Sequence, residues 1–492
     1  MLSCALALAG TPMFDAVEAL KRGDFAGAER SLRTEIGAHP NEAEALSLLG
    51  VALDSQNKFK EADAFHRRAL GLAPRSNSVL DKYGSHLLAS GDENTARDIF
   101  LKAVALNPAD AYANLELGQI ALKHKDGPRA LSYLNRLSPG QKDDPDVAVK
   151  RVIALELSGQ TADANTLFAG LPVRSAAAGS ALAEAGLFDK AETIFESLLA
   201  ADPSNLKVMY NLGSVASRAG HYARAREVLG TALRQQPRNA DVLYALAWAE
   251  DAAGQRESAF RWLAQAAQVA PERADVQRLL AIVAGDIHAY QDSVTAWERY
   301  AALSPGDATG RRERGFARAH AGQLEAGIAD LRDYTARHTD DAIGFYELGV
   351  AESAADPTRG LSSFDRAVAL KPDFAAARSA RGALYYREGK PEAALPDLER
   401  ASALEPGDAM IEDRLGQVYL ALDRLNDALR LFRRATELAP NDYAAHVHLA
   451  NALAEMGQTT ESESIMERIR TWPVQKPTAA SDLLDGGSRV RR

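Results

Sequence analysis

Eight large aromatic and arginine side chains are the residues of this sequence whose types and spacing suggest a specific chemistry. They occupy the fifth, ninth or twelfth place of successive segments of about 34 residues. Aromatic rings and guanidinium groups dominate binding hot spots, so the chemistry they predict is recognition of a partner rather than bond making. The candidate partner-binding residues are Tyr210, Tyr244, Trp248, Arg278, Arg312, Phe316, Tyr346 and Tyr386.

Two interpretations of this set remain open. For any single residue, the favoured interpretation is that it packs against a neighbouring helix. For the set as a whole, the favoured interpretation is a surface that binds a partner. Tyr244 and Trp248 are four residues apart, which places them on one helix face, and Arg278 can meet a carboxylate or stack on a ring. As a recognition surface, these side chains are expected to face solvent.

No catalytic or metal-binding constellation is expected. The sequence contains no GxxxxGK, GxSxG, HExxH or GxGxxG motif, and Cys4 is its only cysteine. The ten histidines are scattered, and His446 and His448 are two apart on a predicted helix, so they point to different sides. We therefore predict no enzyme activity, no metal site and no cofactor.

The elements that position these residues repeat along the chain. In residues 409–442, apolar side chains recur at helical spacing on both sides of a turn at Asp423 and Arg424, and Pro440 ends the second helix. Similar segments fill nearly the whole chain, and their closing prolines lie 34 residues apart wherever neighbouring copies are adjacent, apart from one shortened pair. The closing prolines are Pro40, Pro74, Pro108, Pro203, Pro237, Pro271, Pro305, Pro372, Pro406 and Pro440.

Small residues at two places of the repeat predict closely packed helix pairs. Position 8 is glycine in nine copies, and position 20 is alanine, serine or glycine in all fourteen. Two short antiparallel helices nest only where the crossing side chains are small. Position 24 is large in several copies and is expected to fill the space towards the next repeat, as with Phe100, Phe195, Trp297, Phe364 and Phe432.

This pattern resembles the tetratricopeptide repeat family over residues 9–473. The resemblance implies an all-α fold, a right-handed α–α superhelix of about 14 helix–turn–helix repeats, whose inner groove binds protein segments. Family members that hold acidic C-termini use Lys and Asn at groove positions where this chain has Ser47, Asp81, Leu115 and Tyr210, so that activity is not expected. The asparagine ladder of sugar-transferring relatives is matched only by Asn211.

The predicted domain organisation has five parts. Residues 1–12 form an apolar leader or signal remnant, or a frayed first turn. Residues 13–137 form the first part of the array, and 138–172 a shortened, irregular repeat that could act as a hinge. Residues 173–473 form the second part of the array. Residues 474–492 combine Pro, Gly, Ser and both charges without periodicity, which predicts a disordered tail.

Composition and repeats together favour a non-enzymatic scaffold that binds protein or peptide segments and supports assembly of a multiprotein complex. The net charge of −10 argues against a nucleic-acid partner, and no apolar run long enough to span a bilayer is present. Self-association through uncapped array ends is possible. The alternative is an exported or periplasmic assembly factor of a secretion or polysaccharide-export system, whose groove could hold a glycan. The compartment stays open: periplasmic if residues 1–12 are a signal remnant, cytoplasmic otherwise.

Overall fold

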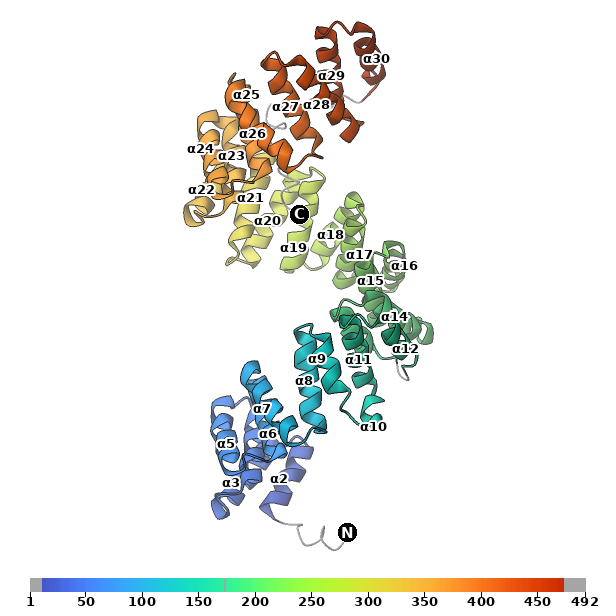
Figure 1. The fold of residues 1–492 in the computed structure, drawn as a ribbon, viewed down its shortest axis with the longest axis vertical. Helices are drawn as coiled ribbons and strands as arrows, with labels where there is room; N and C mark the ends of the chain where they lie inside the picture. Colours follow the sequence, from blue (N-terminus) through green and yellow to red (C-terminus); the bar gives the residue numbers. More distant parts are fainter. Residues whose placement is uncertain (1–10, 172–173, 473–492) are drawn as a thin grey trace. The chain divides into compact units, whose positions relative to one another are not determined.

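The fold is a succession of antiparallel helix pairs (Figure 1). The computed structural model describes residues 11–171 and 174–472, and every regular element in these ranges is a helix. The helices of these ranges form fourteen pairs, and one additional four-residue helix, α10, stands between the fourth and fifth pairs. The predicted all-α architecture of about fourteen helix–turn–helix repeats is therefore confirmed.

The helices divide into two compact units, Met1–His221 and Tyr222–Arg492. The helices of unit 1 are α2 (Pro12–Lys21), α3 (Phe25–Ala38), α4 (Ala43–Asp54), α5 (Phe59–Leu72), α6 (Asn77–Ala89), α7 (Glu93–Leu106), α8 (Ala111–Lys123), α9 (Gly127–Leu134), α10 (Pro139–Lys142), α11 (Pro145–Leu157), α12 (Thr161–Ala169), α13 (Ala176–Glu184), α14 (Phe188–Ala201) and α15 (Leu206–Ala219).

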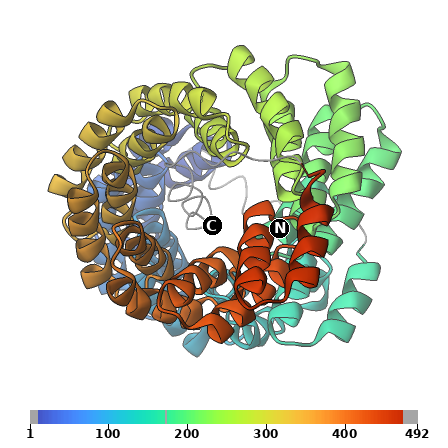
Figure 2. The same cartoon turned by 90° about the horizontal axis from the view of Figure 1, so that it is seen from above.

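The helices of unit 2, drawn from green to red in Figure 2, follow one another along a curved path. The helices of unit 2 are α16 (Tyr222–Gln235), α17 (Ala240–Ala252), α18 (Arg256–Val269), α19 (Ala274–Asp286), α20 (Tyr290–Leu303), α21 (Ala308–His320), α22 (Leu324–Arg337), α23 (Ala342–Ala355), α24 (Pro357–Leu370), α25 (Ala375–Arg387), α26 (Pro391–Leu404), α27 (Ala409–Ala421), α28 (Leu425–Leu438), α29 (Tyr443–Glu455) and α30 (Thr459–Ile469).

Short polar residues begin many first helices. The side chain of Asp110 accepts a hydrogen bond from Ala113 N at 3.1 Å at the start of α8, and Asn239 does the same for Val242 N at 3.2 Å at the start of α17. These caps satisfy N–H groups that have no partner within the helix. A left-handed residue then turns the chain into the second helix, as at Gly220 with φ 86°.

Glycine at position 8 lets each first helix approach the position-24 side chain of its own repeat. A Cβ atom at Gly84 would lie 2.4 Å from the ring of Phe100, and one at Gly416 would lie 2.6 Å from the ring of Phe432. These distances are too short for any larger residue without movement of the ring, so the packing requires glycine. The small residues at position 20 are likewise buried, among them Ala28, which is 0% exposed. Both sequence expectations are confirmed.

Two second helices at and just before the segment 138–172 are shortened in the structure. Helix α9, which precedes the segment, has eight residues, and α12 within it has nine, whereas α5, α7 and α14 have fourteen. Within the segment, a capping box made by Ser138 and Gln141 starts the one-turn helix α10 (Pro139–Lys142). The boundary between the two units falls in the sequence between His221 and Tyr222, outside this segment, and a hinge role for 138–172 stays a prediction.

Two predicted end segments lie mainly outside the described residues. Of the predicted leader, residues 1–12, the first ten lie outside the described residues, and so does the whole predicted tail, residues 474–492. Thr11 is described and caps α2 by accepting a hydrogen bond from Phe14 N. Among the described residues, no helix is both long and apolar enough to cross a membrane.

Candidate functional site

The first helix α17 carries the most exposed aromatic side chain of the predicted set. The Trp248 side chain is 39% exposed and does not belong to the core cluster of neighbouring repeats, whereas Tyr244, one turn earlier, is half-buried against that cluster. The predicted solvent exposure is thus confirmed for Trp248. An exposed indole on a rigid helix presents a large apolar area that a partner can cover with little loss of side-chain entropy.

Two arginines of the following repeat differ in their partners. The Arg273 guanidinium donates to Asp241 Oδ1 at 2.6 Å and to Asp275 Oδ2 at 2.5 Å, and it lies 5.4 Å from the centre of the Tyr244 ring. Arg278 on α19 is exposed and makes no hydrogen bond or ion pair with the residues that the structure describes. Its charge acts on the Tyr300 hydroxyl and the Asp307 carboxyl, and its guanidinium donors remain available to an anionic group.

Asp251 adds an acceptor to the same helix as Trp248. Its atom Oδ1 is buried and has no hydrogen-bond donor among the described residues. Burial raises the pKa of Asp251, and the charge of Arg256 opposes this shift only in part. A buried carboxylate oxygen without a donor is costly unless a ligand N–H or water satisfies it. The α17–α19 surface therefore combines an apolar anchor, a free cation and an unsatisfied acceptor.

Three residues of the predicted set are buried, so their expected solvent exposure is wrong. Arg312 is 9%, Phe316 is 5% and Tyr346 is 1% exposed. Phe316 and Tyr346 belong to one core cluster, in which the Tyr346 ring lies 5.3 Å from that of Phe374. Here α21 contacts α23, and α23 contacts α25, so the inner positions of these first helices fill the space between repeats.

Arg312 lies in a buried ionic network rather than on a surface. Its guanidinium donates to Glu313 Oε1 at 2.7 Å and lies 3.3 Å from both Asp341 Oδ2 and Glu347 Oε2. Burial alone would lower the pKa of Arg312, but the charges of Glu347 and Glu313 outweigh burial and raise the pKa. Tyr334, with its hydroxyl 2.7 Å from Asp341 Oδ2, has its pKa raised to about 12 by burial and by that hydrogen bond. This network holds the repeats together.

The remaining two members are intermediate in exposure. Tyr386 is half-buried on α25 and packs against the core cluster of the following repeats. Tyr210 is half-buried on α15 and belongs to unit 1, whereas the other seven residues belong to unit 2. The structure therefore brings Tyr244 and Trp248 together on one helix face, with Arg278 on the first helix of the next repeat, but does not present all eight residues as one exposed surface.

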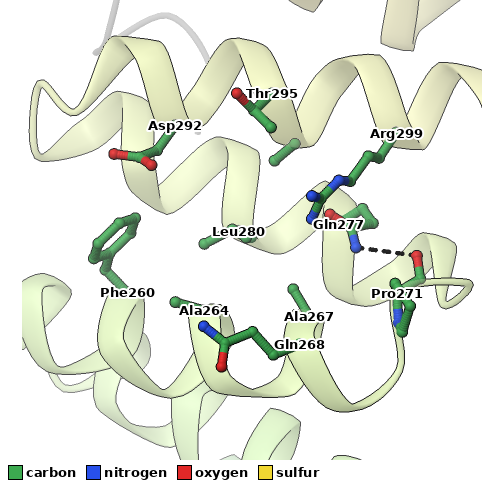
Figure 3. A pocket seen from close by; sticks show the side chains of 11 residues that line it. Phe260, Ala264, Ala267, Gln268, Pro271, Gln277, Leu280, Asp292, Thr295 and Arg299 are labelled. Atoms are coloured by element: carbon green, nitrogen blue, oxygen red, sulfur yellow. Dashed lines mark hydrogen bonds between the residues drawn. The ribbon is translucent and has the colours of Figure 1, made fainter.

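A pocket of about 440 Å³ lies between the second helices of two adjacent repeats in unit 2. Figure 3 shows Phe260, Ala264 and Gln268 approaching from α18, and Asp292, Thr295 and Arg299 approaching from α20. At its end, the buried Gln277 donates through Nε2 to Pro271 O at 3.1 Å. A comparable pocket of about 570 Å³ lies between α9 and α12. Because the same groove recurs between second helices, we attribute both pockets to repeat stacking.

The structure also brings together three residues that the sequence reasoning missed. Asp54, His66 and His86 converge in unit 1, where both imidazoles are buried. One signal was present in the sequence: His66 occupies position 24 of its repeat, where other copies have an aromatic or aliphatic side chain. His446 and His448, by contrast, do not share a partner, since they contact Asp442 O and Asp413 respectively.

Two family models match the chain, and both are described as tetratricopeptide repeat. One matches residues 87–155, 182–233, 216–283 and 419–484, and the other matches residues 16–77 and 350–409. Together these ranges cover more than half of the 492 residues.

Two curated proteins are similar to parts of the chain. The type IV pilus assembly protein PilF of Pseudomonas aeruginosa is 28% identical over 133 residues, which are 27% of this chain and 53% of that protein. The protein adenylyltransferase Fic of Culex quinquefasciatus is 34% identical over 119 residues, which are 21% of this chain and 24% of that protein. The chain thus spans about half of the first relative and a quarter of the second.

Solved helical-repeat structures align over much of the chain. The crystal structure of yeast Tom70 aligns with 96% of this chain and 98% of its own chain, at 15% identity and a TM-score of 0.40.

Proposed function

Because the chain belongs to the tetratricopeptide repeat family, we propose that it is a non-enzymatic scaffold that binds an extended protein segment and supports assembly of a multiprotein complex. The observation that carries this proposal is the exposed Trp248 on α17, with the free cation Arg278 on α19. Rigid arrays of helix pairs offer long surfaces for such binding, since each repeat contacts only its neighbours.

The side chains of this surface suggest the chemistry of the segment. An apolar or aromatic side chain of the partner covers the Trp248 ring, and a carboxylate of the partner pairs with Arg278. An extended peptide that carries an apolar residue and an acidic residue meets both requirements.

A displayed peptide library tests this proposal on the full chain. Peptides selected by the unaltered chain are measured against Trp248→Ala and against Leu303→Ala, a control that removes another exposed side chain, on the second helix α20 (40% exposed). Trp248→Ala should weaken binding by about 2 kcal/mol, or roughly thirtyfold, as is typical of a hot spot. Leu303→Ala should leave binding unchanged.

The melting temperature of the same variants separates a binding role from a packing role. Trp248→Ala should change stability little, because its ring lies outside the core cluster. Equal binding of the selected peptides by Trp248→Ala and the unaltered chain would exclude this surface as the recognition site.

A second candidate function is an exported or periplasmic assembly factor of a secretion or polysaccharide-export system. The similarity to a pilus assembly protein over 133 residues favours an assembly role of this kind. Cell fractionation of the natural full-length protein tests the compartment: recovery in the periplasm supports this candidate, and recovery in the cytoplasm rejects it. Self-association through the end of the last repeat, where Met466 is 41% exposed, stays a prediction.

A further inference from the structure

Three side chains from adjacent helices of unit 1 point towards a common point. Asp54 ends α4, His66 lies in α5 and His86 lies in α6. The distance from His66 Nε2 to Asp54 Oδ2 is 3.0 Å, and that from His86 Nδ1 to Asp54 Oδ1 is 2.6 Å. We propose that Asp54, His66 and His86 form a binding site for one zinc ion per chain.

The histidine in α5 replaces a side chain that packs as hydrocarbon elsewhere. His66 lies sixteen residues after Gly50, the spacing that separates Gly84 from Phe100 and Gly416 from Phe432. A Cβ atom at Gly50 would lie 2.4 Å from His66 Nε2 and 2.6 Å from Cδ2 and Cε1, so the imidazole packs on this glycine as Phe100 packs on Gly84. His66 is 0% exposed, and an imidazole in this place gains nothing over phenylalanine in packing. The imidazole adds a ring nitrogen that contacts Asp54 and that can bind an ion.

The carboxylate of this cluster lacks a permanent cation. The Asp54 side chain is 15% exposed, and its ion-pair contacts within the described ranges are to His66 and His86 alone, with no Lys or Arg within 4 Å. A bound dication would neutralise this half-buried carboxylate, whose close partners in the metal-free chain are two imidazoles. The partial exposure of Asp54 gives an ion a path to two histidines that are themselves buried.

The ligand atoms need only small movements to surround an ion. All three atoms lie within 4.8 Å of one another. Ligand atoms at zinc distances of about 2.1 Å in a tetrahedral arrangement lie about 3.4 Å apart. The contact of Asp54 with His66 therefore has to lengthen by about 0.4 Å, and its contact with His86 by about 0.8 Å. Two imidazoles and one carboxylate with a fourth position for water are a common zinc ligand set, and imidazole disfavours magnesium and calcium.

The positions of the protons on the two imidazole rings bear on the expected affinity for zinc. An ionised carboxylate only accepts, so in the metal-free chain His66 Nε2 and His86 Nδ1 both carry hydrogen. Binding moves these protons to the opposite ring nitrogens. His86 Nε2 lies 3.7 Å from Asp63 Oδ1, a carboxylate that can take up this role, whereas His66 Nδ1 has no hydrogen-bond partner among the described residues. Because one outer partner is lacking, we expect micromolar rather than nanomolar affinity.

The position of the site also indicates what the ion does. It joins α4 and α5 of the second repeat to α6 of the third, so binding stabilises the contact between two repeats. Repeat arrays depend on such interfaces for their stability. The ion is therefore a structural ligand of unit 1, whereas Trp248 belongs to unit 2.

A second group, Asp189, Glu192 and His221, also has metal-ligand atoms within 4.8 Å of one another. Here His221 and Asp189 are exposed, and His221 Nδ1 pairs with Glu192 at 2.7 Å. Solvated groups of this kind are common without an ion, so this cluster carries no proposal. It provides a matched control, because His221→Gln removes a histidine from an equally close but exposed cluster.

Zinc titration of the full chain, after removal of metals with a chelator, tests the site. We expect one zinc ion per chain by calorimetry and the visible absorption of four-coordinate cobalt when cobalt replaces zinc. A hundredfold excess of free ion over the dissociation constant should raise the melting temperature of unit 1 by about 5 °C. Magnesium should produce none of these changes.

Three variants locate the binding. His66→Phe introduces the residue found at this position in other repeats, and His86→Val introduces the residue found at the matching Val215, Val283 and Val418, so both should fold. Each should abolish the cobalt spectrum and the thermal shift, whereas His221→Gln should retain both. Absence of a cobalt spectrum in the unaltered chain, or loss of zinc binding in His221→Gln but not in His66→Phe, would overturn the proposal.

Discussion

Both units bury polar side chains, but they neutralise them differently. In unit 2 the buried carboxylates have arginine partners: Glu250 pairs with Arg226 at 2.8 Å, and Asp397 pairs with Arg381 at 2.6 Å. Glu352, which is 5% exposed, accepts from Arg332 at 2.6 Å and from Ser363 at 2.7 Å. Each charge therefore keeps a fixed counter-charge in the folded state.

In unit 1 several half-buried carboxylates lack such partners. Among the described residues, the close cationic or donor neighbours of Asp54 are two histidines. Burial, followed by repulsion from Asp110, raises the pKa of Asp81 to about 7, and burial also raises the pKa of Glu116. A half-buried carboxyl group that has no arginine partner holds its proton more tightly, or it attracts a cation.

This difference shows that the repeat scaffold does not determine the electrostatics of its interior. The same glycine and small-residue packing accommodates an arginine-neutralised core in unit 2 and an incompletely neutralised one in unit 1. We infer that the fully buried carboxylates of unit 2 are neutralised by its own arginines, with the half-buried Asp251 as an exception, whereas unit 1 responds to protons and metal ions.

The largest expected effect comes from removing a core arginine of unit 2. Arg312→Met should destabilise the folded chain by about 3–5 kcal/mol, because the buried Glu313 and Glu347 lose their guanidinium. Urea unfolding measures the loss. Arg278→Met, at an exposed arginine without an ion pair in the described part of the chain, is the control and should stay within about 0.5 kcal/mol. Equal effects would mean that the Arg312 network does not stabilise unit 2.

Removing an unpaired carboxyl group of unit 1 should have the opposite sign and depend on pH. The folded chain keeps the Asp81 proton up to about pH 7, whereas the unfolded chain releases it near pH 4. Stability therefore falls as the pH rises between these values, and the penalty is complete above pH 7. Asp81→Asn should add about 1–2 kcal/mol at about pH 8, after allowance for solvent screening, and nothing at about pH 4. A gain independent of pH would contradict the raised pKa.

Replacing the buried histidine of unit 1 should have a small effect in metal-free buffer. Phe100 packs on Gly84 in the same geometry that His66 adopts on Gly50, so His66→Phe should change the free energy of unfolding by less than about 1 kcal/mol. The difference from the unaltered chain should grow when zinc is added, since only the unaltered chain gains stability. A large loss without zinc would show that the Asp54–His66 hydrogen bond is itself essential to folding.

The smallest expected effect concerns the shortened segment of unit 1. Helix α10 has four residues and buries none of them, so trypsin should make its first internal cut after Lys142. In unit 2 the turn at Asp356 is also short, but α24 begins directly after it and is capped by the Asp356 side chain, so cleavage after Arg359 should follow later. Mass spectrometry of early fragments gives the order, and an earlier cut at Arg359 would contradict it.

The predicted solvent exposure is correct for some residues of the candidate binding set and wrong for others, and the difference has a physical reason. The helical period places Trp248 and Tyr244 on one face, and that face is exposed at Trp248. The same period places Arg312, Phe316 and Tyr346 at equivalent positions, yet these are buried. Whether an inner position meets solvent depends on how closely the first helices of successive repeats approach, and α21, α23 and α25 contact one another. No local pattern encodes that approach.

The sequence by itself determined the helices, the pairing of neighbours and the glycine contacts, because these depend on residues within one 34-residue repeat. The tertiary structure alone decided which side chains from different repeats meet. Asp54 and His86 are 32 residues apart, and their contact depends on the stacking of two helix pairs. Repeat periodicity fixes local packing through short-range contacts, whereas the chemistry between repeats depends on small rotations that no single repeat specifies.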